Sequence, residues 1–362
     1  MKNTVKLIAF HLPQFHAIPE NDAWWGEGFT EWVNVKKSRP LFPGHQQPRV
    51  PENDQYYNLL DVSALERQMA LASSYGVYGF CYYHYWFNGK LLLEKPLELM
   101  RTLDSRIPYC FCWANEPWAR TWDGNDKEVL MPQHYGGEQE WEAHFQYLLP
   151  FFQDEKYILV DDKPMFVLYR TNSIPNHEEM IAYLDRRCKE AGFAGIYLVE
   201  EKNTFQTESQ CDNTSAIINF EPMFTLKHGR PILARVADKL GKSVLNLFTG
   251  NNLLVYRYDA IWRHILRRKP KDKKPEFRGA FVAWDNTPRK GKNGLVILGA
   301  SPKKFKKYFS KQVQNVAAEG SQFLFINAWN EWCEGTYLEP DTHNGYGYLD
   351  AIASCLEPYK SQ

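Results

Sequence analysis

Eight short apolar segments recur along this chain, and most of the stretches between them have the spacing of amphipathic helices. Most of the segments are almost continuously apolar, which is typical of strands buried on both faces of a parallel sheet. They lie at residues 5–10, 77–83, 109–113, 164–169, 196–199, 216–220, 279–283 and 322–326. Strands that alternate with helices form βαβ units. Eight units predict an α/β fold, a closed (β/α)₈ barrel with long βα loops.

The rival architecture is an open, doubly wound sheet. That fold would be favoured by a Gly-x-Gly-x-x-Gly fingerprint after a strand, but none occurs, and there is no Walker-type phosphate loop. The length of 362 residues suits one large domain or two ordinary ones. No repeat, linker or low-complexity tract divides the chain, so we expect a single barrel domain over residues 1–362.

The charge balance limits the choice of partner. Lys plus Arg and Asp plus Glu are both 43, so the net charge is zero, and we expect no nucleic-acid partner. One basic cluster lies within residues 263–274, and further lysines stand at positions 303, 304, 306 and 307. This pattern favours solvated helix ends; the alternative is contact with an acidic membrane surface or an anionic glycan carrier.

Cysteine usage indicates the compartment. The seven cysteines are odd in number, and Cys110 and Cys112 share one face of a predicted strand without further metal ligands nearby. We therefore expect reduced, buried thiols and neither a metal nor a cofactor. No apolar run of eighteen residues and no secretory signal pattern is present, which predicts a cytoplasmic protein without a transmembrane segment.

The candidate substrate-binding residues cluster after the predicted strands, where barrel enzymes have their active sites. Acids, amides and aromatic rings recur after most of these segments. Such a mixture suits a sugar, because rings stack on the C–H faces of pyranoses while amides and acids bind hydroxyls. The candidates are His11, Gln14, Trp25, His84, Tyr85, Trp113, Asn115, Glu116, Glu221, Trp284, Asp285, Asn327 and Trp329.

The strongest local signal follows the last predicted strand, where Glu331 and Glu334 stand three residues apart between tryptophans. If the chain turns helically there, the two side chains share a face with Cβ atoms about 5–6 Å apart. Such a pair suits acid–base work at a glycosidic bond, because two close acids push their pKa values apart. The alternative interpretation is a helix-capping box or a surface acid pair.

A second pair of acids competes with this one. Asn115-Glu116 follows the third predicted strand, and an Asn-Glu step is typical of the acid/base glutamate in many retaining barrel glycosidases, although usually after the fourth strand. Under that hypothesis Glu116 is the acid/base and Glu331 the nucleophile.

Several motifs together carry a family resemblance. The sequence resembles the WbsX-type glycosyltransferase family of bacterial surface-polysaccharide gene clusters, which is similar to family 99 of the glycoside hydrolases, the endo-α-mannosidases. The match covers nearly the whole chain. The motifs are Phe10–His16, Trp24–Gly26 with Phe29–Trp32, Gly79-Phe80 with His84–Trp86, Trp113–Glu116, and Asn327–Gly335.

The resemblance implies a (β/α)₈ barrel that acts with retention on α-mannoside-like sugars, mannose or rhamnose. It assigns Glu331 to deprotonate the 2-hydroxyl of the sugar, which attacks C1 and gives a 1,2-anhydro sugar. It assigns Glu334 to protonate the leaving oxygen and then to activate the acceptor. Cys333 stands where the hydrolases commonly have His.

The resemblance leaves hydrolysis and transfer open, because the outcome depends on whether the acceptor subsite excludes water. The expected partner is an oligo- or polysaccharide, in surface-polysaccharide (O-antigen or capsule) metabolism. Two alternatives remain: a nucleotide-sugar-dependent glycosyltransferase on the same barrel, and a non-catalytic glycan-binding barrel.

Overall fold

Eight parallel strands form the centre of the molecule. The computed structural model describes residues 4–119, 128–229, 231, 250–271 and 273–359. The strands neighbour one another in the order β1, β14, β12, β10, β9, β8, β4, β2, and β2 pairs with β1 again, which closes the barrel and confirms the predicted fold. They are β1 (Lys6–His11), β2 (Val77–Phe87), β4 (Tyr109–Trp113), β8 (Lys163–Leu168), β9 (Tyr197–Lys202), β10 (Ala216–Asn219), β12 (Glu276–Phe281) and β14 (Phe323–Asn327).

The eight predicted strands are all present, but two have charged ends that the apolar pattern did not reveal. β9 continues to Lys202, and β12 begins at Glu276 and ends at Phe281. Lys202 Nζ lies 3.5 Å from a Glu276 carboxylate oxygen, so charged side chains on the two strands that flank β10 neutralise each other on the barrel wall. A search for apolar runs misses such positions because the partner comes from a distant part of the chain.

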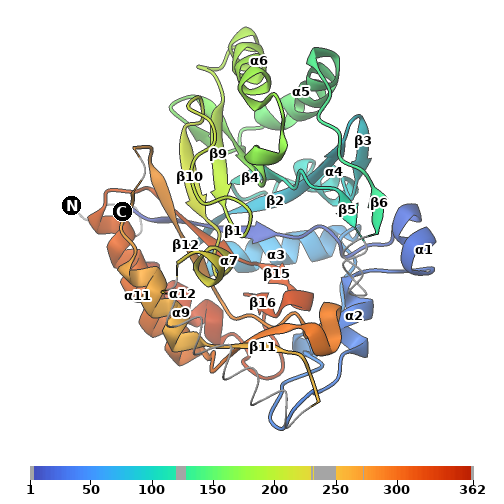
Figure 1. The fold of residues 1–362 in the computed structure, drawn as a ribbon, viewed down its shortest axis with the longest axis vertical. Coiled ribbons are helices and arrows are strands. Elements are labelled where there is room, and N and C mark those ends of the chain that lie inside the picture. Colours follow the sequence, from blue (N-terminus) through green and yellow to red (C-terminus); the bar gives the residue numbers. More distant parts are fainter. Residues whose placement is uncertain (1–3, 120–127, 230, 232–249, 272, 360–362) are drawn as a thin grey trace.

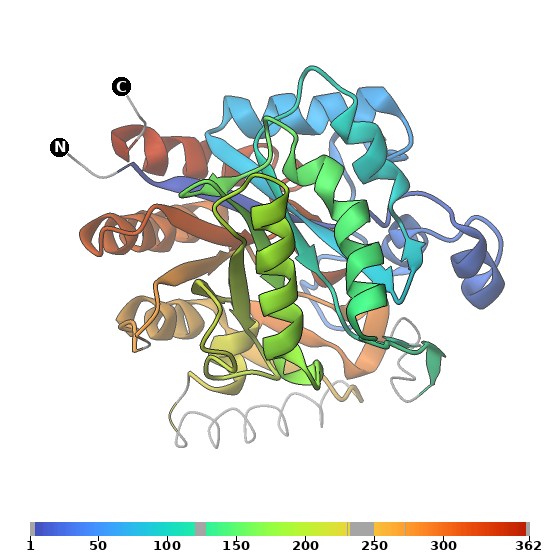
Figure 2. The ribbon, with the colours of Figure 1, turned by 90° about the horizontal axis from the view of Figure 1, so that it is seen from above.

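Helices surround the strands (Figure 2). Most of them occupy the stretches between strands for which the sequence predicts helical spacing, and the Asp61 carboxylate caps the helix that begins at Val62 by accepting a hydrogen bond from the Ser63 N–H. The β9–β10 connection, residues 203–215, contains no helix. No described helix has the length and apolar character needed to cross a membrane. The helices are α3 (Val62–Ser74), α4 (Lys95–Arg101), α5 (Glu138–Phe152), α6 (His177–Glu190), α9 (Tyr258–Arg267), α11 (Pro302–Ala318) and α12 (Gly347–Leu356).

Short elements fill the connections between strands and helices (Figure 1). They comprise α1 (Pro19–Trp25), α2 (Glu31–Lys37), η1 (Glu52–Asp54), β3 (Lys90–Leu92), β5 (Trp118–Ala119), β6 (Val129–Met131), β7 (Leu159–Val160), η3 (Thr171–Ser173), α7 (Met223–Lys227), β11 (Leu254–Arg257), α10 (Thr287–Lys290), η4 (Gly291–Asn293), β13 (Leu295–Leu298), β15 (Asn330–Glu331), η5 (Trp332–Glu334), β16 (Thr336–Tyr337) and η6 (Glu357–Tyr359).

Aromatic side chains dominate the core. Phe10, Phe80, Phe111 and Phe166 are each below 2% exposed, and Phe10 packs edge-on to Phe220 with ring centroids 5.2 Å apart. All seven cysteines are buried and unpaired, as the sequence predicts. This packed wall fixes the strand ends on which the candidate site stands.

Candidate active site

The segment after the last strand turns back on itself. β15 and β16 pair antiparallel, and the single 3₁₀ turn η5 between them begins directly after Glu331 and ends at Glu334. In a 3₁₀ turn residues i and i+3 lie one above the other. The helical turn that would bring Glu331 and Glu334 to one face is therefore present.

Gly335 makes this turn possible. Its φ is +62°, in the left-handed region that favours glycine, and an added Cβ would lie 2.9 Å from both Cβ and N of Asp285. The backbone N–H of Asp285 donates to the Glu334 carbonyl over 2.7 Å. The close approach of these two segments fixes the backbone that carries Glu334.

Glu331 and Glu334 both line a cavity of about 380 Å³ that opens beside the carboxyl ends of the strands. This volume falls in the range of small-molecule sites. Its lining combines acids, amides and aromatic rings, which is the chemistry expected for a sugar. Besides the two glutamates, the lining includes Leu12, Gln14, Tyr83, Tyr85, Glu116, Trp118, Tyr169, Phe205, Phe220, Met223, Trp284, Asn286, Arg289 and Lys290.

Arg289, from α10, bridges the two candidate acids. Its Nη1 donates to Glu334 Oε1 over 2.6 Å, and its Nη2 donates to Glu331 Oε2 over 3.1 Å. The rigid fork of a guanidinium suits two carboxylates at once. One positive charge thus stands between the two acids.

A third carboxylate reaches the same guanidinium. Glu31 begins α2, is fully buried, and accepts a hydrogen bond from Arg289 Nη2 over 2.8 Å. Its backbone carbonyl accepts from the Cys333 thiol over 3.2 Å. Three acids around one arginine leave the cluster with more negative than positive charge when all are ionised.

The environment of Glu331 favours its neutral form. Burial raises the pKa of Glu331 well above its ordinary value, and the charges of Glu334 and Glu31 raise it further, against the opposing attraction of Arg289. A base with a raised pKa is better matched to taking a proton from a hydroxyl near neutral pH.

Gln14 presents unused hydrogen-bonding capacity to the cavity. It is 1% exposed, yet neither its amide nitrogen nor its amide oxygen has a hydrogen-bond partner among the described residues. A buried amide without partners is costly. Hydroxyl groups of a bound sugar could satisfy both atoms.

Tyrosines from two strands that flank β4 form part of the wall. Tyr83 and Tyr85 lie two apart on β2, and Tyr169 follows β8. Burial, helped by nearby carboxylates, raises the pKa of each phenol well above 10. These side chains therefore stay neutral and can donate to a ligand.

The competing acid also reaches the cavity. Glu116 is half-buried and its carboxylate accepts from Arg170 Nη1 over 3.2 Å. Asn115 does not line the cavity; its amide exchanges two hydrogen bonds with the Arg170 backbone, at 2.8 and 2.9 Å. Glu116 thus lines the same cavity but pairs with Arg170 and not with Arg289.

The structure divides the predicted site residues into two groups. Gln14, Tyr85, Glu116, Trp284, Glu331 and Glu334 line the cavity. The others do not appear in its lining, and their described partners lie behind it or elsewhere in the protein. They are His11, Trp25, His84, Trp113, Asn115, Glu221, Asp285, Asn327 and Trp329.

Most of the second group support the barrel wall. His11 Nε2 lies 3.0 Å from Gln68 Oε1, and His84 Nε2 lies 2.8 Å from His144 Nε2. Burial lowers the pKa of His11 to about 4 and that of His84 to about 3, so both are neutral near pH 7. Trp329 is fully buried against Phe80, with ring centroids 5.1 Å apart.

The remaining members also have structural contacts. Trp113 Nε1 donates to the Trp86 carbonyl over 3.1 Å, and Asn327 Nδ2 donates to the Glu221 carbonyl over 3.3 Å. Trp25, in α1, stacks on Phe29 at 5.6 Å. Glu221 binds Thr225 and Arg268.

Asp285 organises the segment that carries Arg289. Its carboxylate accepts from the Thr287 N–H and hydroxyl, and the Gln47 amide donates to it over 2.7 Å. Burial would raise the pKa of Asp285, but the His45 contact and the charge of Arg49 lower it to about 2. A charged Asp285 thereby holds the start of α10.

A second network braces the other side of the turn. Glu339 accepts hydrogen bonds from Trp332 Nε1, Tyr57 Oη and Gln68 Nε2, all between 2.7 and 2.8 Å. The Asn330 amide exchanges two hydrogen bonds with the backbone of Leu12. The end of β1 is thus tied to the residue before Glu331.

Sequence reasoning missed Arg289 and Glu31 as site residues. Arg289 stands four residues after Asp285, just past a predicted strand end, which was the available signal. Glu31 lies inside the Phe29–Trp32 motif but far from any strand. Their contact joins residues 258 positions apart in the chain.

A small group of metal-ligand types lies away from this cavity. His177, Glu178 and Cys211 have ligand atoms within 4.8 Å of one another. Both ring nitrogens of His177 lie against backbone carbonyls, of Ile174 and Gln210, and both Glu178 oxygens accept hydrogen bonds. These groups are already satisfied by the protein itself.

Structural comparison agrees with the barrel. The endo-α-mannosidase of glycoside hydrolase family 99 from Bacteroides thetaiotaomicron matches with a TM-score of 0.56 at 14% identity, over 98% of this chain and 97% of that one. A glycoside hydrolase-like protein matches with a TM-score of 0.60 at 11% identity, over 98% and 94%. At these identities the likeness concerns the fold.

Sequence comparison gives the family. Protein WxcX of Xanthomonas campestris pv. campestris is 36% identical over 357 residues, which cover 97% of this chain and 49% of WxcX, so the chain spans about half the length of this relative. The family model described as glycosyltransferase WbsX matches residues 7–352. The chain therefore belongs to the WbsX glycosyltransferase family, a family of carbohydrate-active enzymes.

Proposed function

We propose that this chain cleaves or transfers α-mannoside-like linkages, of mannose or rhamnose, with retention of configuration, using Glu331 and Glu334. The observation that carries the proposal is the placement of both carboxylates in the lining of one sugar-sized cavity, joined by a single guanidinium. The family and the barrel support carbohydrate chemistry. Surface-polysaccharide metabolism is the proposed setting.

The first step makes a ring on the sugar itself. Glu331 takes the proton of the 2-hydroxyl, and the 2-oxygen attacks C1. As the new O2–C1 bond forms, the bond from C1 to the leaving oxygen breaks, and Glu334 gives its proton to that oxygen. The products are a 1,2-anhydro sugar, a protonated Glu331 and an ionised Glu334.

The second step restores both acids. Glu334 takes a proton from the acceptor hydroxyl, whose oxygen attacks C1 and breaks the O2–C1 bond. The 2-oxygen then recovers its proton from Glu331. Two inversions at C1 give net retention, and the step requires a 2-hydroxyl trans to the leaving group, as in α-mannose and α-rhamnose.

Arg289 has a positioning role in this scheme. Its contacts to both acids hold them at one face of the cavity and offset their mutual repulsion. Because Glu334 must carry a proton in the first step, substrate binding has to weaken its contact with Arg289. Glu31 remains as a buried counter-charge for the arginine.

Hydrolysis and transfer differ only in the acceptor. The aromatic and tyrosine lining supports exclusion of water from the site, which favours transfer to another sugar hydroxyl. The test is to screen α-mannosides and α-rhamnosides, with and without acceptor sugars, and to identify the products and their anomeric configuration. On glycosides whose leaving oxygen needs a proton, Glu331→Gln and Glu334→Gln should lose turnover while keeping the wild-type circular dichroism. Full activity of either variant on such a glycoside would overturn the assignment.

A nucleotide-sugar donor is the second candidate, favoured by the family's description as glycosyltransferases. Calorimetry with nucleoside-diphosphate sugars decides between the two. Tight binding that competes with sugar at the cavity supports a nucleotide donor. Failure of every nucleotide to bind, with turnover of simple glycosides, supports the anhydro-sugar route.

A further inference from the structure

We propose that the outer surface of α9 and α11 binds an anionic lipid membrane. This surface, called the basic face below, consists of Arg263 and Arg267 on α9 and Lys303, Lys307 and Lys311 on α11. All five side chains are exposed. The proposal is independent of the reaction at the cavity.

The composition of α11 is one-sided. Its seventeen residues include five lysines and no acid. Lys303, Lys307 and Lys311 follow one another at intervals of four, so they form one stripe along the helix. The buried face, with Phe305, Phe309 and Val313, points into the protein.

α9 continues the stripe. Arg263 and Arg267 are again four residues apart, opposite the buried side chains of the helix. The two helices are joined through Asp259, which accepts from Lys304 Nζ over 2.6 Å and from Tyr308 Oη over 2.7 Å. The charged stripes therefore lie on adjoining helices.

These charges are not neutralised within the protein. Over the described chain, no carboxylate lies within 4 Å of any cation of the basic face, whereas Lys304 pairs with Asp259. The whole chain has no net charge. A neutral protein with a row of unpaired cations on one face has a preferred orientation toward a negative surface.

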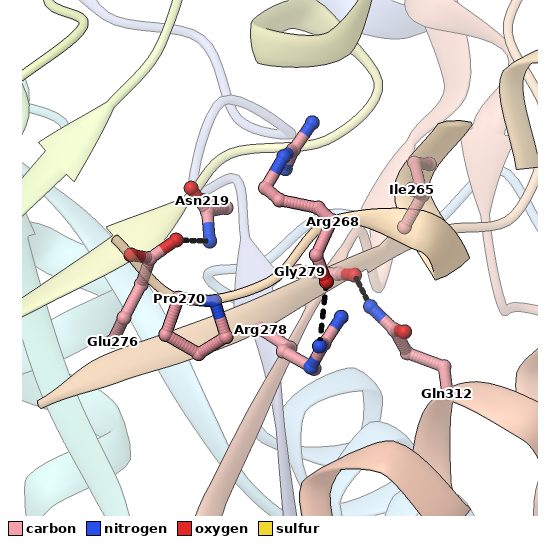
Figure 3. A pocket seen from close by; sticks show the side chains of 8 residues that line it. All are labelled: Asn219, Ile265, Arg268, Pro270, Glu276, Arg278, Gly279 and Gln312. Carbon is pink, nitrogen blue, oxygen red and sulfur yellow. Dashed lines mark hydrogen bonds between the residues drawn. The ribbon is translucent and has the colours of Figure 1, made fainter. Parts of the chain in front are cut away.

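Other members of the predicted 263–274 cluster serve the interior. Figure 3 shows the Arg268 carbonyl accepting from Arg278, beside a small cavity of about 10 Å³. The Arg268 guanidinium binds Glu221, and Lys274 Nζ donates to Thr214 Oγ1 over 2.6 Å. This division separates structural cations from those of the basic face.

An exposed apolar side chain lies at the edge of the basic face. Leu298, at the end of β13 and four residues before α11 begins, is 40% exposed. Its partner across the β11–β13 pair is the exposed Arg257, directly before α9. An exposed leucine beside a cation suits the boundary between headgroups and acyl chains.

The chemistry of the face favours lipid over nucleic acid. Lysines act as point charges that suit a diffuse anionic surface. Binding to single-stranded nucleic acid also uses aromatic platforms, and the aromatic residue between the stripes, Tyr308, is 6% exposed and bonded to Asp259. β13 also bridges to Asp285 through Val296, so a docked membrane would lie near the candidate site.

The test is sedimentation of the intact chain with vesicles of phosphatidylcholine alone or with about one third phosphatidylglycerol. We expect binding only to the anionic vesicles, and weaker binding at high salt. Because each lysine near such a surface contributes roughly fivefold, changing Lys303, Lys307 and Lys311 together to Gln should reduce binding on the order of a hundredfold. Leu298→Gln should reduce it roughly tenfold.

The matched control changes three exposed lysines elsewhere, Lys37, Lys95 and Lys189, to Gln. It should bind as the wild type does. Equal losses in both triple variants, or no preference of the wild type for anionic vesicles, would overturn the proposal. So would salt-dependent binding to DNA in place of vesicles. Circular dichroism checks that each variant is folded.

Discussion

Arg289 donates to Glu334 across 2.6 Å, from a helix of four residues to a turn 45 positions further along the chain. The same side chain reaches Glu331 and Glu31. The arrangement explains how three acids can stand together in a mostly buried place. It also makes the arginine the residue through which their charges are coupled.

Replacing the arginine tests this coupling. Arg289→Lys keeps the charge but loses the fork that reaches several carboxylates, so we expect kcat/KM to fall on the order of a hundredfold. Arg289→Met leaves buried acids without a counter-charge, and we expect about 3 kcal/mol less stability. Kinetics and chemical denaturation measure the two effects. A fully active Arg289→Met protein would contradict the account.

Removing the third acid should shift the pH profile. The charge of Glu31 raises the pKa of Glu331, so Glu31→Gln lowers that pKa. Because Glu331 must be ionised to take the 2-hydroxyl proton, the acidic limb of kcat/KM then moves to lower pH. The exposed Glu27→Gln serves as control and leaves the profile unchanged. A shift of the acidic limb to higher pH in Glu31→Gln would contradict the prediction.

Gln14 should contribute to substrate binding. Its unpartnered amide can form two hydrogen bonds with a sugar, each contributing about 1 kcal/mol. Gln14→Leu should therefore raise KM roughly tenfold or more with a smaller change in kcat. The exposed Gln153→Leu is the control. An unchanged KM would remove Gln14 from the binding site.

Gly335 should tolerate no side chain. Gly335→Ala combines a left-handed backbone with a contact of 2.9 Å to Asp285, and we expect about 3 kcal/mol lower stability together with loss of activity. Gly345 has a φ of +52° but open space around it, so Gly345→Ala should cost only about 1 kcal/mol. Equal effects would show that the contact with Asp285 is unimportant.

Asp285 should link stability to acid pH. Its pKa falls from 3.8 in the unfolded chain to about 2 in the folded protein. Its charged form therefore contributes stability above pH about 4, and this contribution is lost as the pH falls toward 2, a change of about 2 kcal/mol. Asp285→Asn should lack that part of the pH dependence. If the free energy of unfolding, measured by chemical denaturation, changes with pH in the same way in both proteins, the prediction is wrong.

The barrel strands were predictable because most of their residues are apolar, and a run of apolar residues can be recognised in the sequence without knowing which residues it contacts. The spacing of Glu331 and Glu334 predicted a shared face only if the chain turns helically there, and the 3₁₀ turn that meets this condition is known from the structure. The charged end of β9, with Glu200 and Glu201, was not, since burial of a carboxylate depends on partners such as Gln206 and Asn203 that only the fold supplies.

The site was predicted less completely than the fold. His84 was a candidate because it follows a predicted strand, although it meets His144 and does not line the cavity. Asn286, which also follows a predicted strand, was not a candidate and lines the cavity. Conversely, Glu31 became a site residue only because the loop after β1 folds over the last strand's turn. Local pattern records which residues follow a strand, but not the direction in which each side chain points.

The leaving group gives the most direct test of the two assigned roles. We would compare Glu331→Gln and Glu334→Gln on a natural α-mannoside and on an aryl α-mannoside whose phenolate leaves without a proton. The account predicts that Glu334→Gln loses the natural substrate but still releases the phenol of the aryl glycoside in the first step, whereas Glu331→Gln loses both reactions. Equal losses for both variants on both substrates, or turnover of a 2-deoxy substrate by the wild type, would contradict it.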